Sequence, residues 1–393
     1  MIVSHLQLTD FRNYEKAEVA LRPGANLFVG RNGQGKTNLV EAIGYLATLG
    51  SHRVSGDQAL IRSGQDAAIV RARLEHGERE LLVELQLNRS GANRAQVNRA
   101  PAKPRDLPRH VASVLFAPED LALVRGEPSG RRRFLDQLLV QLTPRLAGVV
   151  SDYERVLKQR NTLLKTSRAA ARSGDLSTLE VWDERLIALG SELIAARLEL
   201  IDRLEPFVAD AYRSIAGDDH AAALAMRLSV RGDQPDDAEE GGDAGAPASG
   251  VRHGIDAEQL AALFREALAR VRRTELERGL TLVGPHRDDL ELQLNALPAR
   301  GYASHGESWS FALSLKLAAA AILRRDSPTG DPVVVLDDVF AELDSTRRAR
   351  LAEAIGDYEQ VLITAAVFED VPAALAGHVV RIRAGRVLEE GEE

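Results

Sequence analysis

Residues 30–37 read Gly-Arg-Asn-Gly-Gln-Gly-Lys-Thr and fit the pattern G-x-x-x-x-G-K-[ST]. The apolar stretch Leu27–Val29 precedes them, and apolar side chains recur at helical spacing from Lys36 to about Leu49. In this context the glycines let backbone N–H groups turn towards an anion, and the helix N-terminus adds positive potential. The segment therefore predicts a phosphate site in which Lys36 bridges the β- and γ-phosphates of a nucleotide and Thr37 ligates Mg²⁺. We assign ATP binding to Gly30, Arg31, Asn32, Gly33, Gln34, Gly35, Lys36, Thr37 and Asn38.

An acidic motif follows a run of β-forming residues near the other end of the sequence. Residues 332–344 read Pro-Val-Val-Val-Leu-Asp-Asp-Val-Phe-Ala-Glu-Leu-Asp, which is typical of a buried parallel strand with carboxylates at its carboxyl edge. Together with the phosphate loop, it predicts that Asp337 holds Mg²⁺ directly or through water and that Asp338 polarises the attacking water. The predicted catalytic set is Lys36, Asp337 and Asp338. Because Asp is one methylene shorter than the Glu usual at the second position, we expect slow hydrolysis.

A serine–glycine turn lies between these two motifs. Residues 303–307 read Ala-Ser-His-Gly-Glu and precede a helical stretch, Trp309–Arg325. Such a turn faces an anion, although Ser308 and Ser310 would also serve as a plain helix cap. The order of the three motifs is that of an ABC-type ATPase head, in which the serine turn of one subunit meets the γ-phosphate held by another. The predicted signature residues acting in trans are Ser304, Gly306 and Glu307, and the predicted D-loop residue is Asp344.

The predicted fold is α/β, an ABC-type P-loop ATPase head of mixed sheets and helices. Lys36 and Asp337 stand 301 positions apart, so both ends of the chain must close one site. We expect residues 1–125 and 279–393 to form the head and residues 126–278 to form an inserted, mainly helical lobe. The expected strands of the C-terminal part are 280–283, 290–294, 333–336, 361–363 and 379–382, and residues 67–97 alternate like an antiparallel sheet.

The charge balance argues against a uniformly basic nucleic-acid binder. The chain has 50 Lys and Arg against 58 Asp and Glu, and its net charge is −8. Aromatic residues make up 4%, which argues against a base-stacking surface. Residues 233–250 hold six acids, no Lys or Arg, and nothing apolar larger than Ala, so they predict a disordered acidic loop. The rest of the chain carries a net charge of −2, which permits an arginine-lined face.

The sequence also indicates a compartment. It contains no Cys, which excludes disulfides, thiolate metal sites and Cys nucleophiles and favours a reducing environment. The longest apolar run, Leu317–Leu323, has seven residues, whereas a membrane span needs about 20. The first ten residues lack the regions of a signal peptide. We expect a soluble cytoplasmic protein without a membrane partner.

Four further stretches resemble the RecF family of bacterial recombination mediators, which are related to the heads of SMC and Rad50 proteins. They read Leu-Thr-Asp-Phe-Arg-Asn-Tyr at 8–14, Phe-Ala-Pro-Glu-Asp-Leu at 116–121, Arg-Arg-Arg-Phe-Leu-Asp at 131–136 and Gly-Pro-His-Arg-Asp-Asp-Leu at 284–290. The phosphate loop occurs in thousands of proteins, but the last stretch, placed before a Ser-x-Gly turn, is close to family-specific. The resemblance covers the chain except the acidic loop.

The resemblance implies an ATP- and Mg²⁺-dependent switch rather than a metabolic enzyme, with weak ATPase activity stimulated by DNA. It implies an ATP-dependent homodimer that binds double-stranded DNA and junctions between duplex and single-stranded DNA. It also implies action with RecR and RecO in loading the RecA recombinase at gaps. By the same analogy Lys36, Thr37, Asp337 and Ser304 carry the switch, and Arg12 contacts phosphate.

Three positions depart from the family pattern. Glu307 stands where many relatives have Gln, and its charge would weaken closure around a γ-phosphate. The strand that ends at residues 363–366 lacks a clear switch His, so the γ-phosphate sensor is unassigned. The strand Val114–Phe116 is not followed by a metal-sensing Gln, for which Glu119 or Asp120 would have to substitute.

Arginine clusters provide the candidate DNA contacts, because Arg suits phosphate recognition. The alternative is that they are solvated helix faces. The candidates are Arg131, Arg132, Arg133, Arg272 and Arg273.

Two other functions share the head motifs. They are the ATPase subunit of an ABC transporter, disfavoured by the long helical insertion, and an SMC-like structural chromosome protein, for which these helices are too short. Residues 286–289, His-Arg-Asp-Asp, are either a metal cluster or a hydrogen-bond network. We favour the network because adjacent side chains point in different directions.

Overall fold

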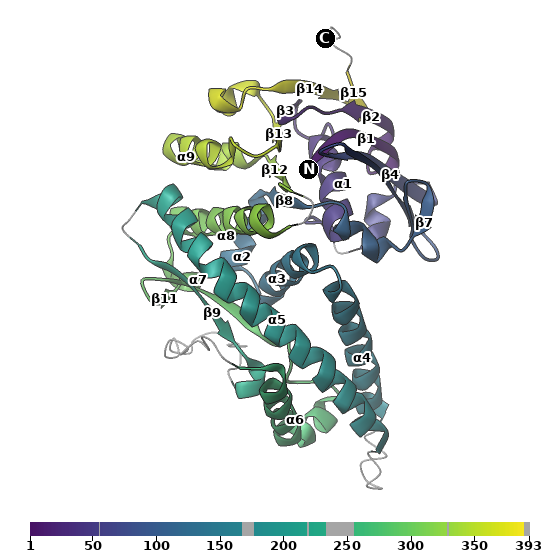
Figure 1. Cartoon of the computed structure of the whole chain (residues 1–393), viewed down its shortest axis with the longest axis vertical. Helices are drawn as coiled ribbons and strands as arrows, with labels where there is room; N and C mark the ends of the chain where they lie inside the picture. Colours follow the sequence, from purple (N-terminus) through teal and green to yellow (C-terminus); the bar gives the residue numbers. More distant parts are fainter. Residues whose placement is uncertain (55, 167–176, 218–219, 233–254, 328–329, 389–393) are drawn as a thin grey trace. The chain divides into compact units, whose positions relative to one another are not determined.

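The structure is a computed structural model that describes residues 1–54, 56–166, 177–217, 220–232, 255–327 and 330–388 (Figure 1). The predicted acidic loop, 233–250, lies outside the described residues. The chain divides into two compact units. The first unit comprises Met1–Leu121, Asp210–Gly217 and Trp309–Glu393, and the second comprises Ala122–Ala209 and Asp218–Ser308.

An antiparallel sheet in the first unit has the strand order β2-β1-β4-β5-β6-β7. Its strands are β1 (Ile2–Phe11), β2 (Tyr14–Ala20), β4 (Ala67–His76), β5 (Arg79–Asn88), β6 (Arg94–Val97) and β7 (Ala100–Ala102). Buried and exposed side chains alternate along β4 and β5, as the pattern of residues 67–97 predicts. One face of this sheet is therefore available to the core.

A second sheet of the first unit carries the predicted nucleotide motifs, in the order β15-β14-β3-β13-β12-β8. Its strands are β3 (Gly24–Val29), β8 (Ser113–Phe116), β12 (Val333–Asp337), β13 (Gln360–Ala365), β14 (His378–Arg383) and β15 (Arg386–Val387). The five strands from β14 to β8 are parallel, so their carboxyl ends meet at one edge. The strand β13 separates β3, which leads into the phosphate loop, from the acidic strand β12.

Helix α1 (Lys36–Thr48) joins the two sheets of the first unit into one core (Figure 1). Its Leu39, Val40 and Ile43 belong to a single buried cluster with residues of both sheets. The cluster includes Leu8 from the antiparallel sheet and Val335 from the parallel one. Burial of this apolar stripe fixes the N-terminus of α1 at the carboxyl edge of the parallel strands. Helix α9 (Ser345–Ile355) also belongs to this unit.

The second unit combines helices with a small antiparallel sheet of order β11-β10-β9. The strands are β9 (Ala222–Arg227), β10 (Asp289–Leu294) and β11 (Leu297–Pro298). The helices that contribute to it are α2 (Leu121–Arg125), α3 (Pro128–Leu142), α4 (Leu146–Thr166), α5 (Ser177–Ala216), α6 (Ala257–Arg278), α7 (Ala299–Tyr302) and the start of α8 (His305–Asp326). No described helix combines the length and the apolar character that a membrane crossing requires.

Two expectations about residues 279–308 differ from the structure. Residues 280–283 are not a strand, because the backbone N–H groups of Thr281 and Leu282 bind the side chains of Asn161 and Glu275 instead of a neighbouring strand. The predicted head boundary at residue 279 also differs from the observed division, which places residues 279–308 in the second unit. The reason is that β10 pairs with β9 rather than with the parallel sheet.

Candidate functional site

The phosphate loop connects β3 to α1 and requires glycine at two positions. At Gly30 a Cβ would lie 2.4 Å from the backbone oxygen of Ile382. Gly35 has a φ of +115°, and a Cβ there would lie 2.8 Å from the Tyr14 hydroxyl. That hydroxyl donates to the Gly35 carbonyl at 3.1 Å. These close contacts with strands on either side fix the shape of the loop.

The side chain of Lys36 turns back into the phosphate loop. Its Nζ donates to the Gly30 carbonyl at 2.8 Å and lies 3.3 Å from Asn32 Oδ1, and the residue is buried. An ammonium group bonds ionised phosphate oxygens more strongly than neutral carbonyls. Contact with phosphate stays a prediction, and the placement of a cation inside the loop favours it.

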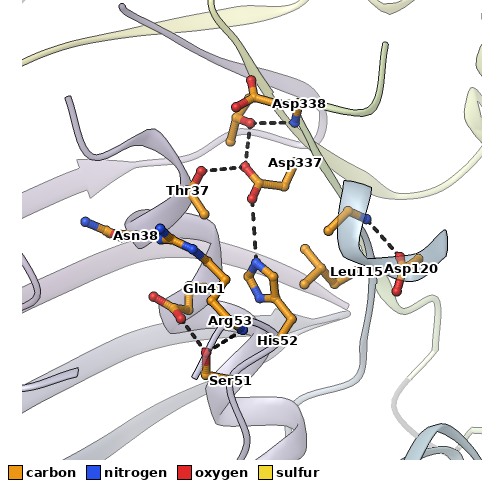
Figure 2. A network of polar contacts seen from close by, with 12 residues as sticks. Thr37, Asn38, Glu41, Ser51, His52, Arg53, Leu115, Asp120, Asp337 and Asp338 are labelled. Carbon is orange, nitrogen blue, oxygen red and sulfur yellow. Dashed lines mark hydrogen bonds and ion pairs between the residues drawn. The ribbon is translucent and has the colours of Figure 1, made fainter. Parts of the chain in front are cut away.

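Asp337 ends β12 beside the start of α1 (Figure 2). Its Oδ1 accepts hydrogen bonds from Thr37 Oγ1 at 2.9 Å and from Thr364 Oγ1 at 2.7 Å. Burial works to raise the pKa of Asp337, but the interactions with His52, Thr364 and Thr37 outweigh it and hold this pKa below its ordinary value. The carboxylate is therefore ionised at neutral pH.

These oxygen atoms fit Mg²⁺. The ion prefers oxygen ligands and is usually bound by one or two carboxylates together with substrate phosphates. Asp337 and the Thr37 hydroxyl would hold it next to the loop. In the part of the chain that the structure describes, no three His, Cys, Asp or Glu side chains gather as a metal cluster, so Mg²⁺ would need the nucleotide as a further ligand. When bound, the ion neutralises charge on the phosphates.

Asp338 continues beyond the strand in the left-handed backbone region, with a φ of 51°. Its N–H donates to Thr364 Oγ1 at 2.9 Å. Burial raises the pKa of Asp338; the charge of Lys36 opposes this rise and that of Asp337 adds to it. A raised pKa makes a carboxylate a stronger base. Its role in polarising water stays a prediction.

His52 belongs to the site although it is part of no motif. Its Nε2 lies 3.6 Å from Asp337 Oδ2 (Figure 2). The chain reverses after α1 and runs back along it, so that Ser51 binds Glu41 and Arg53 binds Asn38. The sequence indicates that the helix ends near Gly50. It does not indicate that the chain then runs back along the helix.

Arg12, the predicted phosphate contact, lies close to the same helix. Its guanidinium donates to both oxygens of Glu41, at 2.8 and 2.6 Å, and to the Ala59 carbonyl at 3.0 Å. The structure therefore shows Arg12 holding α1 and the segment before β4. Its contact with phosphate stays a prediction.

The signature turn, in the second unit, begins helix α8 with a capping box. Ser304 Oγ accepts from the Glu307 N–H at 3.3 Å, and Glu307 Oε2 accepts from the Ser304 N–H at 2.7 Å. The hydrogen bonds with Ser304, helped by His220 at 3.0 Å, hold the pKa of Glu307 below its ordinary value. A capping box accepts either Gln or Glu at this position, so Glu307 can stand where many relatives have Gln.

The predicted D-loop residue also caps a helix. Asp344 precedes α9, and its Oδ1 accepts from the Arg347 N–H at 2.9 Å. Its carboxylate also pairs with the Arg347 guanidinium. Asp344 is half-exposed, and its role in a D-loop stays a prediction.

Arg131, one of the DNA candidates, is a structural residue. It is 3% exposed and donates to both oxygens of Asp289, at 2.7 and 2.8 Å. It also donates to the carbonyls of Leu123 and Gly126. Burial leaves Arg131 no surface for a duplex, so its placement contradicts the predicted contact.

The other four candidates lie nearer the surface. Arg272 forms an ion pair with Asp183, and Arg132 donates to a backbone carbonyl at 2.8 Å. Arg133 and Arg273 are exposed. Their contact with DNA stays a prediction.

Comparison with known proteins agrees with this geometry. A family model described as the RecF/RecN/SMC N terminal domain matches residues 2–384. The DNA replication and repair protein RecF of Clavibacter michiganensis subsp. michiganensis is 64% identical, over 99% of this chain and 96% of its own length. That of Leifsonia xyli subsp. xyli is 64% identical, over 99% and 100%. The chain belongs to the RecF family.

Solved structures give the same result for the fold. A structure of the recombination mediator protein RecF–ATP in the RecFOR pathway is 26% identical, covers 98% of both chains and has a TM-score of 0.83. An SMC head bound to the C-winged helix domain of ScpA is 15% identical, covers 99% of this chain and 97% of its own, and has a TM-score of 0.52. The predicted ABC-type ATPase head is confirmed.

Proposed function

We propose that the chain is an ATP-dependent DNA-binding protein of recombinational repair and replication restart. Two copies joined by ATP clamp duplex DNA near its junctions with single-stranded DNA. With RecO and RecR they promote RecA loading at gaps, and slow ATP hydrolysis resets the clamp. The proposal is supported by relatives named DNA replication and repair protein RecF and by a neighbour of the RecFOR pathway. These relatives favour it over a transporter subunit or an SMC-like structural protein.

The observation that carries the proposal is the meeting of Lys36, Thr37 and Asp337 at one edge of the parallel sheet. They come from opposite ends of the sequence, and the hydrogen bond between Thr37 and Asp337 joins them. A nucleotide held there leaves its γ-phosphate for a second anion-binding group. The Ser304 turn at the start of α8 is such a group, and in our proposal a second copy supplies it.

The first unit offers another surface for duplex DNA. It contains none of the arginines that the sequence clusters suggested. Six basic side chains lie between the end of β5 and η2 (Pro104–Arg109), and all are exposed. None makes an ion pair with a carboxylate in the described part of the chain, and residues 89–109 contain one acid, Asp106. We call this surface the basic edge: Arg89, Arg94, Arg99, Lys103, Arg105 and Arg109.

The chemistry of the basic edge favours the phosphates of a duplex. Residues 89–109 contain no aromatic side chain on which a base would stack. Asn98 and Arg99 both have positive φ, which is the geometry of a tight hairpin turn that projects between β6 and β7. Cations on such a rigid support neutralise backbone phosphates irrespective of base sequence.

Gel filtration with and without a slowly hydrolysed ATP analogue tests the proposal. It is repeated with duplex DNA at two salt concentrations. We expect the analogue to produce a dimer that retains DNA, and the higher salt to release the DNA. A chain that stays monomeric and retains no DNA with the nucleotide contradicts the clamp.

Two variants separate the parts of the clamp. Lys36→Met removes the loop cation and should abolish nucleotide-dependent dimerisation. Ser304→Arg should retain nucleotide binding but block the dimer, because the added charge and bulk stand where the second γ-phosphate is expected. Equal dimerisation by Ser304→Arg and the unaltered chain would contradict the assignment of the signature turn.

A further inference from the structure

The two oxygens of Asp337 have different surroundings. Oδ1 accepts the hydroxyls of Thr37 and Thr364, whereas no hydrogen bond from the described residues reaches Oδ2. His52 Nε2 lies 3.6 Å from Oδ2 (Figure 2). This distance is longer than a hydrogen bond. The imidazole therefore faces Asp337 Oδ2 without forming a hydrogen bond to it.

His52 Nε2 is a buried polar atom that has no hydrogen-bond partner among the described residues. Its side chain is 15% exposed. Buried polar atoms without partners are rare, and one beside a phosphate site calls for an explanation. Asp337 Oδ2 is the acceptor that His52 Nε2 faces.

The loop that carries His52 is held from both sides. Ser51 Oγ donates to Glu41 and accepts from the N–H of Arg53 at 2.9 Å and of Val54 at 3.1 Å. Arg53 donates to Asn38 Oδ1 at 3.1 Å. These contacts fix the backbone around His52 to the first two turns of α1, so its ring is directed at Asp337 before any ligand binds.

A metal-sensing Gln is missing from the segment after β8, and Asp120 in that segment does not take its place. Asp120 lies 2.8 Å from Lys316 Nζ and accepts from the Ala117 N–H. Its carboxylate is therefore engaged away from Asp337. His52 is the side chain that the fold brings to the free oxygen instead.

We infer that His52 is a positioning residue for the metal ion that accompanies the nucleotide. It limits rotation of the Asp337 carboxylate from the Oδ2 side, while Thr37 and Thr364 limit it from the Oδ1 side. Partners that orient a metal-binding carboxylate typically change metal affinity about 10–100-fold. This inference rests on the proposed function, because it assumes that the loop binds ATP with Mg²⁺.

Titration with a fluorescent ATP analogue, in Mg²⁺ and in EDTA, tests the inference. His52→Gln and His52→Asn are matched, since both are neutral amides and only Gln places a nitrogen near the position of Nε2. We expect His52→Asn to weaken binding about 10-fold or more in Mg²⁺ and to leave binding in EDTA unchanged. His52→Gln should retain most of the Mg²⁺-dependent affinity. The control is His76→Gln, at the exposed end of β4.

Three results would overturn the inference. In the first, His52→Asn binds like the unaltered chain in Mg²⁺. In the second, it weakens binding equally in EDTA, which indicates damage to the loop rather than to metal positioning. In the third, the unaltered chain binds no nucleotide in either buffer, and then the proposed function fails as well. Failure of the first two kinds leaves the proposed function intact.

Discussion

Arginine has opposite roles in two regions of the molecule, one in each unit. In the second unit Arg160 is fully buried and donates to Asp183 at 2.7 Å, Glu275 at 2.6 Å and Thr281 at 2.7 Å. In the first unit the five arginines of the basic edge are exposed, and none pairs with a carboxylate of the described chain. The same residue type thus closes a core in one region and leaves an uncompensated surface charge in the other.

The difference teaches that a run of arginines in sequence does not locate a charged surface. The guanidinium offers five donors in a planar fork, which carboxylates and backbone carbonyls can engage together. Arg131 stands in a run of three and is buried, where it bonds Asp289 and two backbone carbonyls. The arginines of the basic edge are spread over residues 89–109, in the segments that precede, form and follow the hairpin β6–β7. An arginine is available to a ligand only where the fold does not bring a carboxylate from elsewhere in the chain to pair with it.

The largest expected effect concerns the buried side of this comparison. Arg160→Met leaves the buried Glu275 without its ion-pair partner and leaves Asp183 with Arg272 alone, and loss of one member of a buried ion pair costs about 3–5 kcal/mol. Urea unfolding followed by circular dichroism measures the change. Arg155→Met is the matched control, because Arg155 lies on the same helix in an exposed pair with Asp152. Equal losses in both variants would remove the distinction between buried and exposed arginine.

The exposed side of the comparison is tested by DNA binding. The triple variant Arg94→Gln, Arg99→Gln and Arg105→Gln should weaken duplex binding about 10–100-fold at physiological salt. It should also flatten the dependence on salt, by about 0.9 in the log–log slope for each phosphate that the protein no longer neutralises. Fluorescence anisotropy with a labelled duplex, in the presence of the ATP analogue, measures both quantities.

The control for the triple variant uses two candidates from the sequence clusters. Arg133→Gln with Arg273→Gln removes exposed positive charge from the second unit and leaves the basic edge intact. We expect a smaller loss of affinity. If this pair weakens binding as much as the triple variant does, the basic edge is not the main contact.

Local physical chemistry made the nucleotide site predictable. The strand, the glycine loop and the helix that starts at Lys36 follow from neighbouring residues, as does the buried run that ends at Asp337. Helix α6 also begins at a local signal, since Asp256 is its N-cap and its side chain accepts from the Gln259 N–H. In each case the signal lies within a few residues of the element it determines.

The parts that escaped prediction depend on distant residues. His52 reaches Asp337 because Ser51 binds Glu41 on the preceding helix, a contact that no periodicity encodes. The strand expected at 280–283 fails because Asn161 and Glu275 bind its backbone. For residues 286–289 the sequence favoured a hydrogen-bond network but did not identify the partners. These come from distant helices, among them Tyr153, whose hydroxyl lies 2.7 Å from His286.

A smaller effect concerns pH. It changes the protonation of His286 and Asp288 in the buried network, whereas the arginines stay charged. Burial lowers the pKa of His286 to about 3, helped by the charges of Arg287 and Arg132. As pH falls below about 6.5, the unfolded chain binds a proton that folded His286 does not, so stability falls. Burial also raises the pKa of Asp288 to about 6; here the folded state binds the extra proton, and stability rises as pH falls.

His286→Gln separates these two contributions. Between about pH 7.5 and about pH 5.5, the unaltered chain should lose about 1 kcal/mol more of its free energy of unfolding than the variant loses. Urea unfolding at the two pH values measures the difference, which does not depend on the stability of the variant at either pH alone. Parallel losses in both proteins would show that His286 does not titrate as its burial requires.

The smallest expected effect is that of Arg273, which we compare with its neighbour Arg272 in the same cluster. Arg273 is exposed and pairs with Glu277 on its own helix, so Arg273→Ala should change the free energy of unfolding by less than about 0.5 kcal/mol. Arg272 pairs with Asp183, whose carboxylate is buried and shared with Arg160, so Arg272→Ala should cost more, about 1–3 kcal/mol. Both changes remove one arginine from adjacent positions of α6, so helix propensity and net charge are matched. A difference in urea unfolding then reports only whether the arginine reaches a buried carboxylate, whereas equal values would mean that Arg160 alone satisfies Asp183.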